Sequence, residues 1–471
     1  MTARPHDETD SPLYKLLRRA VDIRPEEVRA VMSSFAFFFF LLSSYFVLRP
    51  IRDAVAAASG ANKLSWLFTA TLTTTLLLNP FFAWLVVRFP VRRVIAISYH
   101  FFVANILIFY AILRFVSTGE GSATDVWMGR VFFVWTTVFA LFNTSIFWCL
   151  MADSYRSEQA KRLFGFIGVG GTLGSIIGSA TTASLANSIG AVNVLLVSAV
   201  LIEIAVFTIV KFPLTSQGAA TPKLGKRARY DDDDEVIGGS IWAGFSAVLK
   251  SPYLLGICAF MVLYTVGSTF LYFEQADIVG RYYATATART AILAKLELAA
   301  QVLTVVTQIF LTGRLIRWVG LAMALALQPF VSIAGFGMLG AVPVFGTLAW
   351  FTVARRGSNF AVTNPAMEVL FTVVPREDKY KAKNIIETFV YRGGDQVGAW
   401  AYRGLLAAGL SMAGISFVAV PLSAVWLALG LWLGWKQVAL AKALTAQRPN
   451  QLSHMDPLPE APLATPLGAA K

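Results

Sequence analysis

Charged side chains lie inside long apolar runs of this 471-residue sequence, and they are the residues most able to do chemistry. At mid-depth in a membrane such a side chain costs about 2.5–3.5 kcal/mol or more, so it usually faces a cavity or a partner. Arg49 and Arg52 are about one helical turn apart, and Asp53 follows directly. Their planar guanidinium groups could bind phosphate or carboxylate oxygens while Asp53 orients one of them. The alternative is that each arginine extends from a helix end to the membrane surface.

Further candidates for binding an anion lie in the second half of the chain. They are Lys295, Arg355, Arg356, Arg392 and Gln396. Two adjacent arginines within an apolar run are hard to explain by packing alone. Near the last of these candidates, a spacing of four predicts one polar helical stripe made of Lys383, Glu387, Tyr391 and Asp395. We expect the helix that carries this stripe to form the wall of a cavity.

Acidic residues in these runs could couple an ion to a bound solute or tune the charge of its site. The candidates are Asp53, Glu274, Glu387 and Asp395. Glu274 has no obvious local partner, whereas Asp277 and Arg281 are four apart and could simply pair. Lys295 and Glu297 are two apart, which places them on different faces of a helix, so each needs a partner elsewhere. A salt bridge between Lys295 and Glu274 is the structural alternative to a role in binding.

Enzyme and metal chemistry find no support in the sequence. It contains neither a Walker-type loop ending in Gly-Lys-Ser/Thr nor a Gly-x-Ser-x-Gly elbow. The two cysteines, Cys149 and Cys258, lie in apolar runs, and the three histidines are scattered. We therefore expect a protein that is not an enzyme and has neither a cofactor nor a metal site. No cleaved signal peptide is expected near Met1.

The composition is that of an integral membrane protein. Hydrophobic residues make up 56% of the chain and charged residues only 14%, whereas soluble domains average roughly 45–50% and about 25%. The mean hydropathy of +0.62 agrees. A net charge of +13 could indicate nucleic acid in a soluble protein, but here basic loops facing an anionic membrane leaflet explain it better. The expected partners are lipid and a small anionic solute, with no nucleic acid.

Apolar runs of the length that crosses a bilayer, about 20 residues, predict twelve transmembrane helices and an all-α fold. The expected ranges are 30–48, 64–88, 94–115, 127–151, 163–186, 190–211, 253–274, 290–312, 319–341, 344–370, 384–410 and 414–438. With both termini inside, roughly 28 of the 40 basic residues lie on that side. We therefore expect a multi-pass protein of the cell (inner) membrane with both termini in the cytoplasm.

The chain divides into five segments. A cytoplasmic segment with an interfacial helix is expected at 1–29, a six-helix bundle at 30–211, a polar cytoplasmic linker at 212–252, a second six-helix bundle at 253–438 and a disordered tail at 439–471. The first helices of the two bundles start about 223 residues apart, which is typical of a transporter built from two parallel repeats. Glycines at spacing four, at positions 170, 174 and 178, predict close helix packing.

Basic loops could control access to a cavity between the bundles. The candidates are Lys161, Arg162, Arg314, Arg317 and Lys383. The stretch Gly313-Arg314-Leu315-Ile316-Arg317-Trp318-Val319-Gly320 resembles the G-x-L-x-x-R-x-G signature of the major facilitator superfamily. This resemblance implies a bundle of that type, with two sets of six helices related by a pseudo-twofold axis.

Three motifs resemble the ATP/ADP antiporters of plastids and intracellular bacteria. Leu48-Arg49-Pro50-Ile51-Arg52-Asp53 is similar to their L-R-x-x-K-D motif, and Phe147-Trp148 with Glu158 to Phe164 is similar to their F-W and E-A-K-R-F segments. Glu368, Pro375 and Lys379 to Lys383 resemble a third stretch. Arg52 replaces the family's first lysine, Gln396 replaces another, and Thr136 stands near a missing acid. Glu274 matches a family glutamate.

The resemblance implies a divergent bacterial member that exchanges a nucleotide or another phosphorylated or carboxylated metabolite. It would act as a monomer by alternating access between two orientations of its halves. Two alternatives stay open from the sequence: a proton-coupled facilitator of another metabolite or drug, with Glu274 or Asp395 carrying the proton, and a membrane sensor or scaffold in which the buried charges are only structural pairs.

Overall fold

A computed structural model describes residues 23–88, 91–117, 119, 121–155, 157–211, 248–310, 312–375, 382–383 and 385–452. The segment at 1–29, in which an interfacial helix is expected, lies outside these residues except for its end, where a 3₁₀ turn, Pro25–Glu27, leads into the first long helix. Most of the linker at 212–252 and of the tail at 439–471 also lies outside them.

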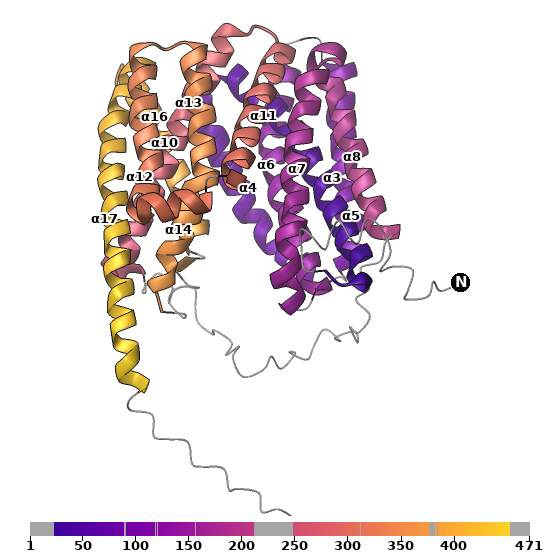
Figure 1. The fold of residues 1–471 in the computed structure, drawn as a ribbon. Coiled ribbons are helices and arrows are strands. Elements are labelled where there is room, and N and C mark those ends of the chain that lie inside the picture. The colour runs from indigo at the N-terminus through magenta and orange to yellow at the C-terminus, as the bar shows by residue number, and fades with distance from the viewer. Residues whose placement is uncertain are drawn as a thin grey trace, which may run out of the picture.

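The described residues are overwhelmingly helical. We call α3 to α8 the N-terminal half; its helices are α3 (Val28–Ser59), α4 (Ala61–Arg88), α5 (Val91–Ala111), α6 (Ala123–Ser154), α7 (Ser157–Ile189) and α8 (Ala191–Lys211), with a π-helical turn, Ile112–Val116, after α5. Figure 1 shows these indigo to magenta helices packed together on one side of the molecule. Apolar side chains on most faces of each helix favour burial in a bundle or in lipid over contact with water.

The C-terminal half comprises α10 to α17 and lies beside the first half (Figure 1). Its helices are α10 (Pro252–Tyr282), α11 (Ala286–Phe310), α12 (Thr312–Ala341, broken at Gly320), α13 (Phe345–Ser358), α14 (Asn364–Leu370), α16 (Tyr391–Ala407) and α17 (Met412–Leu452). A π-helical turn, Asn359–Thr363, joins α13 to α14, and another, Ile386–Val390, precedes α16.

Nine helices of the described residues are long and apolar enough to cross a membrane, so the protein is a multi-pass membrane protein. The expected spans at 64–88, 344–370 and 384–410 are not among the nine. In the last two, the π-helical turns divide the polar helices into shorter pieces, such as α13 with 14 residues and α16 with 17. Among the described residues, length and hydropathy therefore identify nine of the twelve expected spans.

The predicted end of the first span at residue 48 is wrong. Helix α3 continues through Pro50 to Ser59, because a proline inside a packed membrane helix is tolerated when its neighbours satisfy the freed backbone groups. Arg49, Arg52 and Asp53 consequently lie within a helix and not at its end. This removes the interpretation in which both arginines extend from a helix terminus to the membrane surface.

Glycines at spacing four bring α7 against α3, as the sequence predicted. A β-carbon at Gly170 would lie 2.6 Å from the Phe35 carbonyl oxygen, and β-carbons at Gly174 and Gly178 would collide with the carbonyls of Phe39 and Ser43. The Ser43 hydroxyl donates a hydrogen bond to the Gly174 carbonyl at 3.0 Å. The two helices therefore touch backbone to backbone at three positions spaced about one turn apart.

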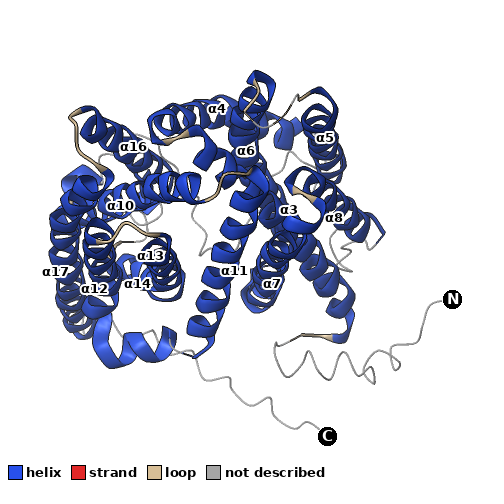
Figure 2. Ribbon diagram, turned by 90° about the horizontal axis from the view of Figure 1, so that it is seen from above, coloured by secondary structure: helices blue, strands red, loops and turns tan. Residues whose placement is uncertain are grey.

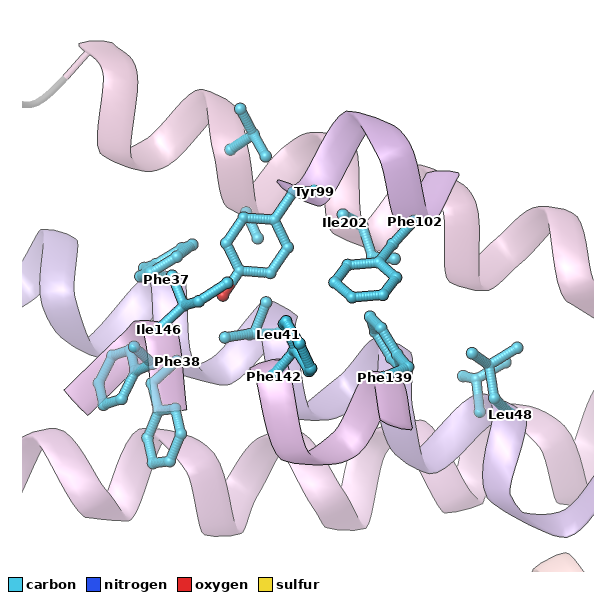
Figure 3. Close-up of a cluster of buried hydrophobic side chains, with 14 of the residues drawn as sticks. Phe37, Phe38, Leu41, Leu48, Tyr99, Phe102, Phe139, Phe142, Ile146 and Ile202 are labelled. Carbon is cyan, nitrogen blue, oxygen red and sulfur yellow. The ribbon is translucent and has the colours of Figure 1, made fainter. Parts of the chain in front are cut away.

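Aromatic and aliphatic side chains fill the interior of the N-terminal half. Figure 3 shows Phe37, Tyr99, Phe102 and Phe139 gathered between α3, α5 and α6. A different buried cluster joins the halves: it contains Ala54 and Leu64 from the end of α3 and the start of α4, with Phe273 and Val279 from the end of α10. The cluster lies at the end of the bundle where α3 ends, at Ser59. This cluster gives the halves one apolar contact at that end, and α11 also packs against α7 and α3.

Candidate functional site

A cavity of about 290 Å³ lies between the two halves. Its walls come from α3, α4 and α6 of the N-terminal half and from α10, α12, α13 and α16 of the C-terminal half, together with the π-helical turn after α13. Seen from above, α10, α13 and α16 lie to the left of α3, α4 and α6 (Figure 2). Seven of the residues that the sequence proposed for anion binding or for tuning charge line this cavity. They are Arg49, Arg52, Arg355, Arg356, Arg392, Asp395 and Gln396.

Arg52 is held by a carboxylate from its own helix. Its Nε and Nη2 atoms donate to Asp53 Oδ1 at 3.0 and 2.7 Å, and the guanidinium carbon lies 5.4 Å from the Phe133 ring centre. Tyr272 of α10 donates its hydroxyl to the same Asp53 oxygen at 2.9 Å. Asp53 is buried. Its hydrogen bonds with Arg52 orient that arginine, as predicted from the sequence, and the hydrogen bond from Tyr272 connects the two halves.

Glu297 of α11 binds two arginines at once. Arg49 Nη1 of α3 donates to Glu297 Oε1 at 3.1 Å, and Arg356 Nη1 of α13 donates to Oε2. Gln301 donates to Oε1 as well, at 3.1 Å. Glu297 is buried, whereas Lys295, two residues earlier, is exposed and does not line the cavity. The sequence placed these two on different faces but did not identify Glu297 as the partner of the arginines.

Arg355 is held without a carboxylate. It donates to the Ser332 hydroxyl at 3.2 Å, to the Ser268 hydroxyl at 2.7 Å and to the Tyr264 carbonyl at 3.0 Å. Its guanidinium carbon also lies 5.4 Å from the Tyr264 ring centre and 5.9 Å from that of Trp426. No described acidic residue forms an ion pair with it. A buried cation fixed only by neutral groups keeps its full charge available to an anion in the cavity.

Helix α16 supplies the remaining polar wall. Arg392, Asp395 and Gln396 all line the cavity, and Gln396 accepts a hydrogen bond from Thr69 of α4 at 3.0 Å. The side chain of Glu387 lies outside the described residues. Lys383 instead binds Glu368 of α14 at 2.8 Å. The single stripe predicted from Lys383 to Asp395 does not hold, because the π-helical turn between them shifts the helical register.

Several uncharged residues of the cavity were not expected from the sequence. Gln328 and Thr352 both line it. The amide nitrogen and oxygen of Gln328 and the hydroxyl of Thr352 are buried and have no hydrogen-bond partner within the described structure. Tyr264 adds aromatic surface beside Tyr391, which the sequence had already placed on the helix expected to form the cavity wall. Polar atoms that are buried without partners are costly, which favours a bound solute or water as their partner. Neutral residues of this kind are common in membrane helices, so the sequence carried no signal for them.

Other predicted residues lie away from the cavity. Glu274 is fully buried and accepts a hydrogen bond from Ser416 at 2.7 Å, so the salt bridge to Lys295 considered from the sequence is not formed. Asp277 and Arg281 form the predicted pair. Neither they nor Glu274 line the central cavity.

The expected gating residues are only partly described. Arg162, at the start of α7, binds Glu27 at 3.0 Å and so ties α7 to the beginning of α3. Lys383 binds Glu368, as above. The side chains of Lys161, Arg314 and Arg317 lie outside the described residues.

The charge balance of the site is positive. Five arginines line the cavity, and three carboxylates, Asp53, Glu297 and Asp395, lie in or directly behind its wall. Five against three leaves two positive formal charges, placed among apolar helices where electrostatic attraction is weakly screened. The arrangement is suited to holding an anion with more than one negative charge, and guanidinium groups match phosphate and carboxylate oxygens particularly well.

A bundle of apolar helices around a central cavity lined by charged residues is typical of membrane transporters, and the comparison with known families agrees. The family model described as the Major Facilitator Superfamily matches residues 30–394. The chain therefore belongs to the Major Facilitator Superfamily, a family of transporters and not of enzymes. A bacterial homologue of the iron transporter ferroportin, solved in an inward-facing state, shares the fold with a TM-score of 0.61 at 11% identity, covering 87% of this chain and 98% of the other.

Within this superfamily the chain is a divergent relative of nucleotide carriers. It is 21% identical to ADP,ATP carrier protein 1 of Chlamydia trachomatis over 89% of this chain and 90% of the carrier. It is 24% identical to ADP,ATP carrier protein 2 of Chlamydia pneumoniae, but there the match covers 47% of this chain and only 44% of the carrier. The resemblance drawn from the three motifs is thus confirmed at the level of a distant relative.

Proposed function

We propose that the protein is a secondary active transporter of a nucleotide-like organic anion and that it exchanges such anions by alternating access. The observation that carries the proposal is the set of five arginines lining one cavity between the two halves. The similarity to ADP,ATP carriers over most of the chain supports a nucleotide as the solute. A site between two halves is what alternating access requires, since the halves can rock around it.

The proposed architecture is two sets of six transmembrane helices. Nine spans are apolar enough to be recognised, and the three others of the predicted twelve coincide with α4, α13 with α14, and α16. All three line the cavity, and a helix that faces a polar cavity need not be apolar throughout. Both termini would face the cytoplasm, because the basic loops favour that side of an inner membrane.

The solute is expected to be of moderate size and to carry about two or more negative charges. The cavity volume of about 290 Å³ is close to the lower limit of about 300 Å³ for small-molecule sites. The arginines would bind phosphate oxygens, while Tyr264, Tyr391 and the unbonded amide of Gln328 offer aromatic and hydrogen-bonding surface to a base or sugar. Because one chain forms the whole cavity, we propose that the monomer is the functional unit.

Uptake into proteoliposomes tests this function. Radiolabelled ATP or ADP is offered outside vesicles that contain either no nucleotide or unlabelled nucleotide. We expect saturable uptake that depends on internal nucleotide and survives a proton uncoupler. The absence of saturable uptake of any nucleotide would reject this solute class, and uptake abolished by the uncoupler would reject strict exchange in favour of proton coupling.

A further inference from the structure

Glu297 occupies a special position among the charged residues of the bundle. It lies on α11 of the C-terminal half and binds Arg49 on α3 of the N-terminal half together with Arg356 on α13 of its own half. Among ion pairs whose two partners the structure describes, Arg49–Glu297 is the one that joins the halves. A single carboxylate therefore pairs with one arginine from each half and leaves one net positive charge on the three side chains.

The two arginines are accessible from the cavity, and the carboxylate is not. Arg49 and Arg356 each have 22% of the side chain exposed, against 5% for Glu297, and both arginines line the cavity while Glu297 does not. A guanidinium has five N–H donors, of which Glu297 engages only a few. The Nε atom of Arg49 is buried without a partner in the described structure. An anion in the cavity can consequently contact the exposed parts of these two arginines without first meeting Glu297.

We infer that Glu297 is a tethered counter-anion that a bound solute must displace in order to release the contact between the halves. The inference rests on the proposed function, since it concerns the same cavity. In the empty protein, Glu297 holds Arg49 and Arg356. When a phosphate or carboxylate group of the solute takes over the donors of these arginines, the ion pair across the halves is lost, and the halves are free to move relative to each other.

Two neighbouring contacts strengthen this inference. The hydrogen bonds from Tyr272 to Asp53 and from Thr69 to Gln396 also join the halves, and Tyr272 and Gln396 line the cavity. Together with the Arg49–Glu297 pair, three of the described polar contacts between the halves thus involve a residue that lines the cavity. The contacts of Ser65 with Ala399, of Trp400 with Thr69 and of Ala191 with Thr287 do not. A ligand shifts a conformational equilibrium only through different contacts in the two states, and competition with Glu297 supplies such a difference.

A purely structural ion pair would behave differently. If Glu297 only holds the arginines in place, its removal should loosen them and weaken anion binding. If Glu297 competes with the solute, its removal should strengthen anion binding, because the arginines no longer have to be taken from an internal partner. It should also slow release of the solute, since no carboxylate returns to the arginines. The two interpretations therefore predict opposite signs for the change in affinity.

The test compares wild type, Glu297→Gln and Glu297→Asp as full-length proteins in detergent and in proteoliposomes. Isothermal titration measures the Kd of ADP, and the vesicles give the exchange rate. We expect Glu297→Gln to bind ADP about tenfold more tightly and to exchange it about tenfold more slowly. Glu297→Asp, which keeps the charge but is one methylene shorter, should lie between the two. Asp277→Asn, in the exposed pair with Arg281, is the matched control and should match the wild type.

Weaker or unchanged ADP binding by Glu297→Gln, or by Glu297→Asp if the glutamine variant does not fold, would overturn the inference. Inorganic pyrophosphate serves as a second probe, because its charge does not depend on a nucleoside. If pyrophosphate binds the wild type and ADP does not, the nucleotide proposal fails, while the sign of the change between wild type and variant still decides the role of Glu297. An equal Kd for pyrophosphate in both proteins would reject the counter-anion.

Discussion

Arg52 and Arg355 line the same cavity from different halves, but the protein holds them in different ways. Arg52 is bound by Asp53, the next residue of its own helix, at 2.7 Å. Arg355 is bound by two serine hydroxyls and a carbonyl and lies close to two aromatic rings. The first arginine is neutralised by its partner, and the second is not.

This difference assigns the two arginines different weights in binding. Burying a cation is costly unless a counter-charge is near. Arg355 has no described carboxylate partner, so its positive charge is available to attract an anionic solute. The pair of Arg52 and Asp53 is closer to neutral and is suited to orientation and to contact between the halves through Tyr272. We therefore expect substitution of Arg355 to have a larger effect on anion binding than substitution of Arg52.

Replacing Arg355 by alanine should have the largest effect. The change removes the charge without a described counter-ion and leaves Ser268 and Ser332 without their donor. Hydrogen bonds to charged groups contribute about 1.5–3 kcal/mol, so we expect the Kd of ADP to rise about 100-fold. Titration of the purified variant measures it. A loss below about threefold would mean that Arg355 only braces the helices.

Lysine substitutions separate charge from geometry. At position 355, lysine keeps the charge but cannot present a planar fork to three acceptors, so we expect about a tenfold loss of exchange activity. At position 52, lysine can still pair with Asp53, and the antiporters that this sequence resembles have a lysine there. We expect less than a threefold loss, measured as exchange in proteoliposomes. Equal losses at both positions would remove the distinction between the two arginines.

Asp53→Asn should turn Arg52 into a second free cation. The amide keeps an acceptor for Arg52 and Tyr272 but lacks the negative charge. We expect ADP to bind about threefold more tightly and the melting temperature in detergent to fall, because a buried arginine loses its counter-charge. Weaker binding in a protein that melts normally would instead show that Asp53 presents Arg52 to the solute.

Lys295→Ala should have the smallest effect. The side chain is exposed and does not line the cavity, although the sequence placed it among the binding candidates. We expect changes in Kd and exchange rate of less than twofold. A loss of tenfold or more would show that Lys295 reaches the solute in another orientation of the halves, and the comparison between Arg52 and Arg355 would then be incomplete.

The sequence predicted the helical fold well because a bilayer demands long apolar runs, which are visible without any tertiary information. Helix ends were harder to predict. Proline often ends a helix in water, yet Pro50 lies inside α3, where neighbouring helices accommodate it. The π-helical turn at 386–390 could not be seen either, because its register shift depends on packing with other helices.

The charged residues that line the cavity could be picked out from the sequence, but the partners with which they form ion pairs and hydrogen bonds could not. Ionisable residues in apolar runs are conspicuous because they are expensive there, and six of the seven proposed binding residues line one cavity. Spacing placed Lys295 and Glu297 on different faces, but only the packing of α11 against α3 and α13 shows which face is inside. The partners of Arg355 are serines and a carbonyl, whose positions no local pattern reveals.

The glycines of α7 meet carbonyl oxygens of α3, which belong to the backbone and cannot rotate aside as side chains do. Sliding α3 along α7 by one residue would disturb all three contacts together, so the two helices should move as one rigid body. Arg49 and Arg52 are part of α3 and would move with it. A shift of α7 where it packs against α11 would therefore move α3, and with it the two arginines of the anion site.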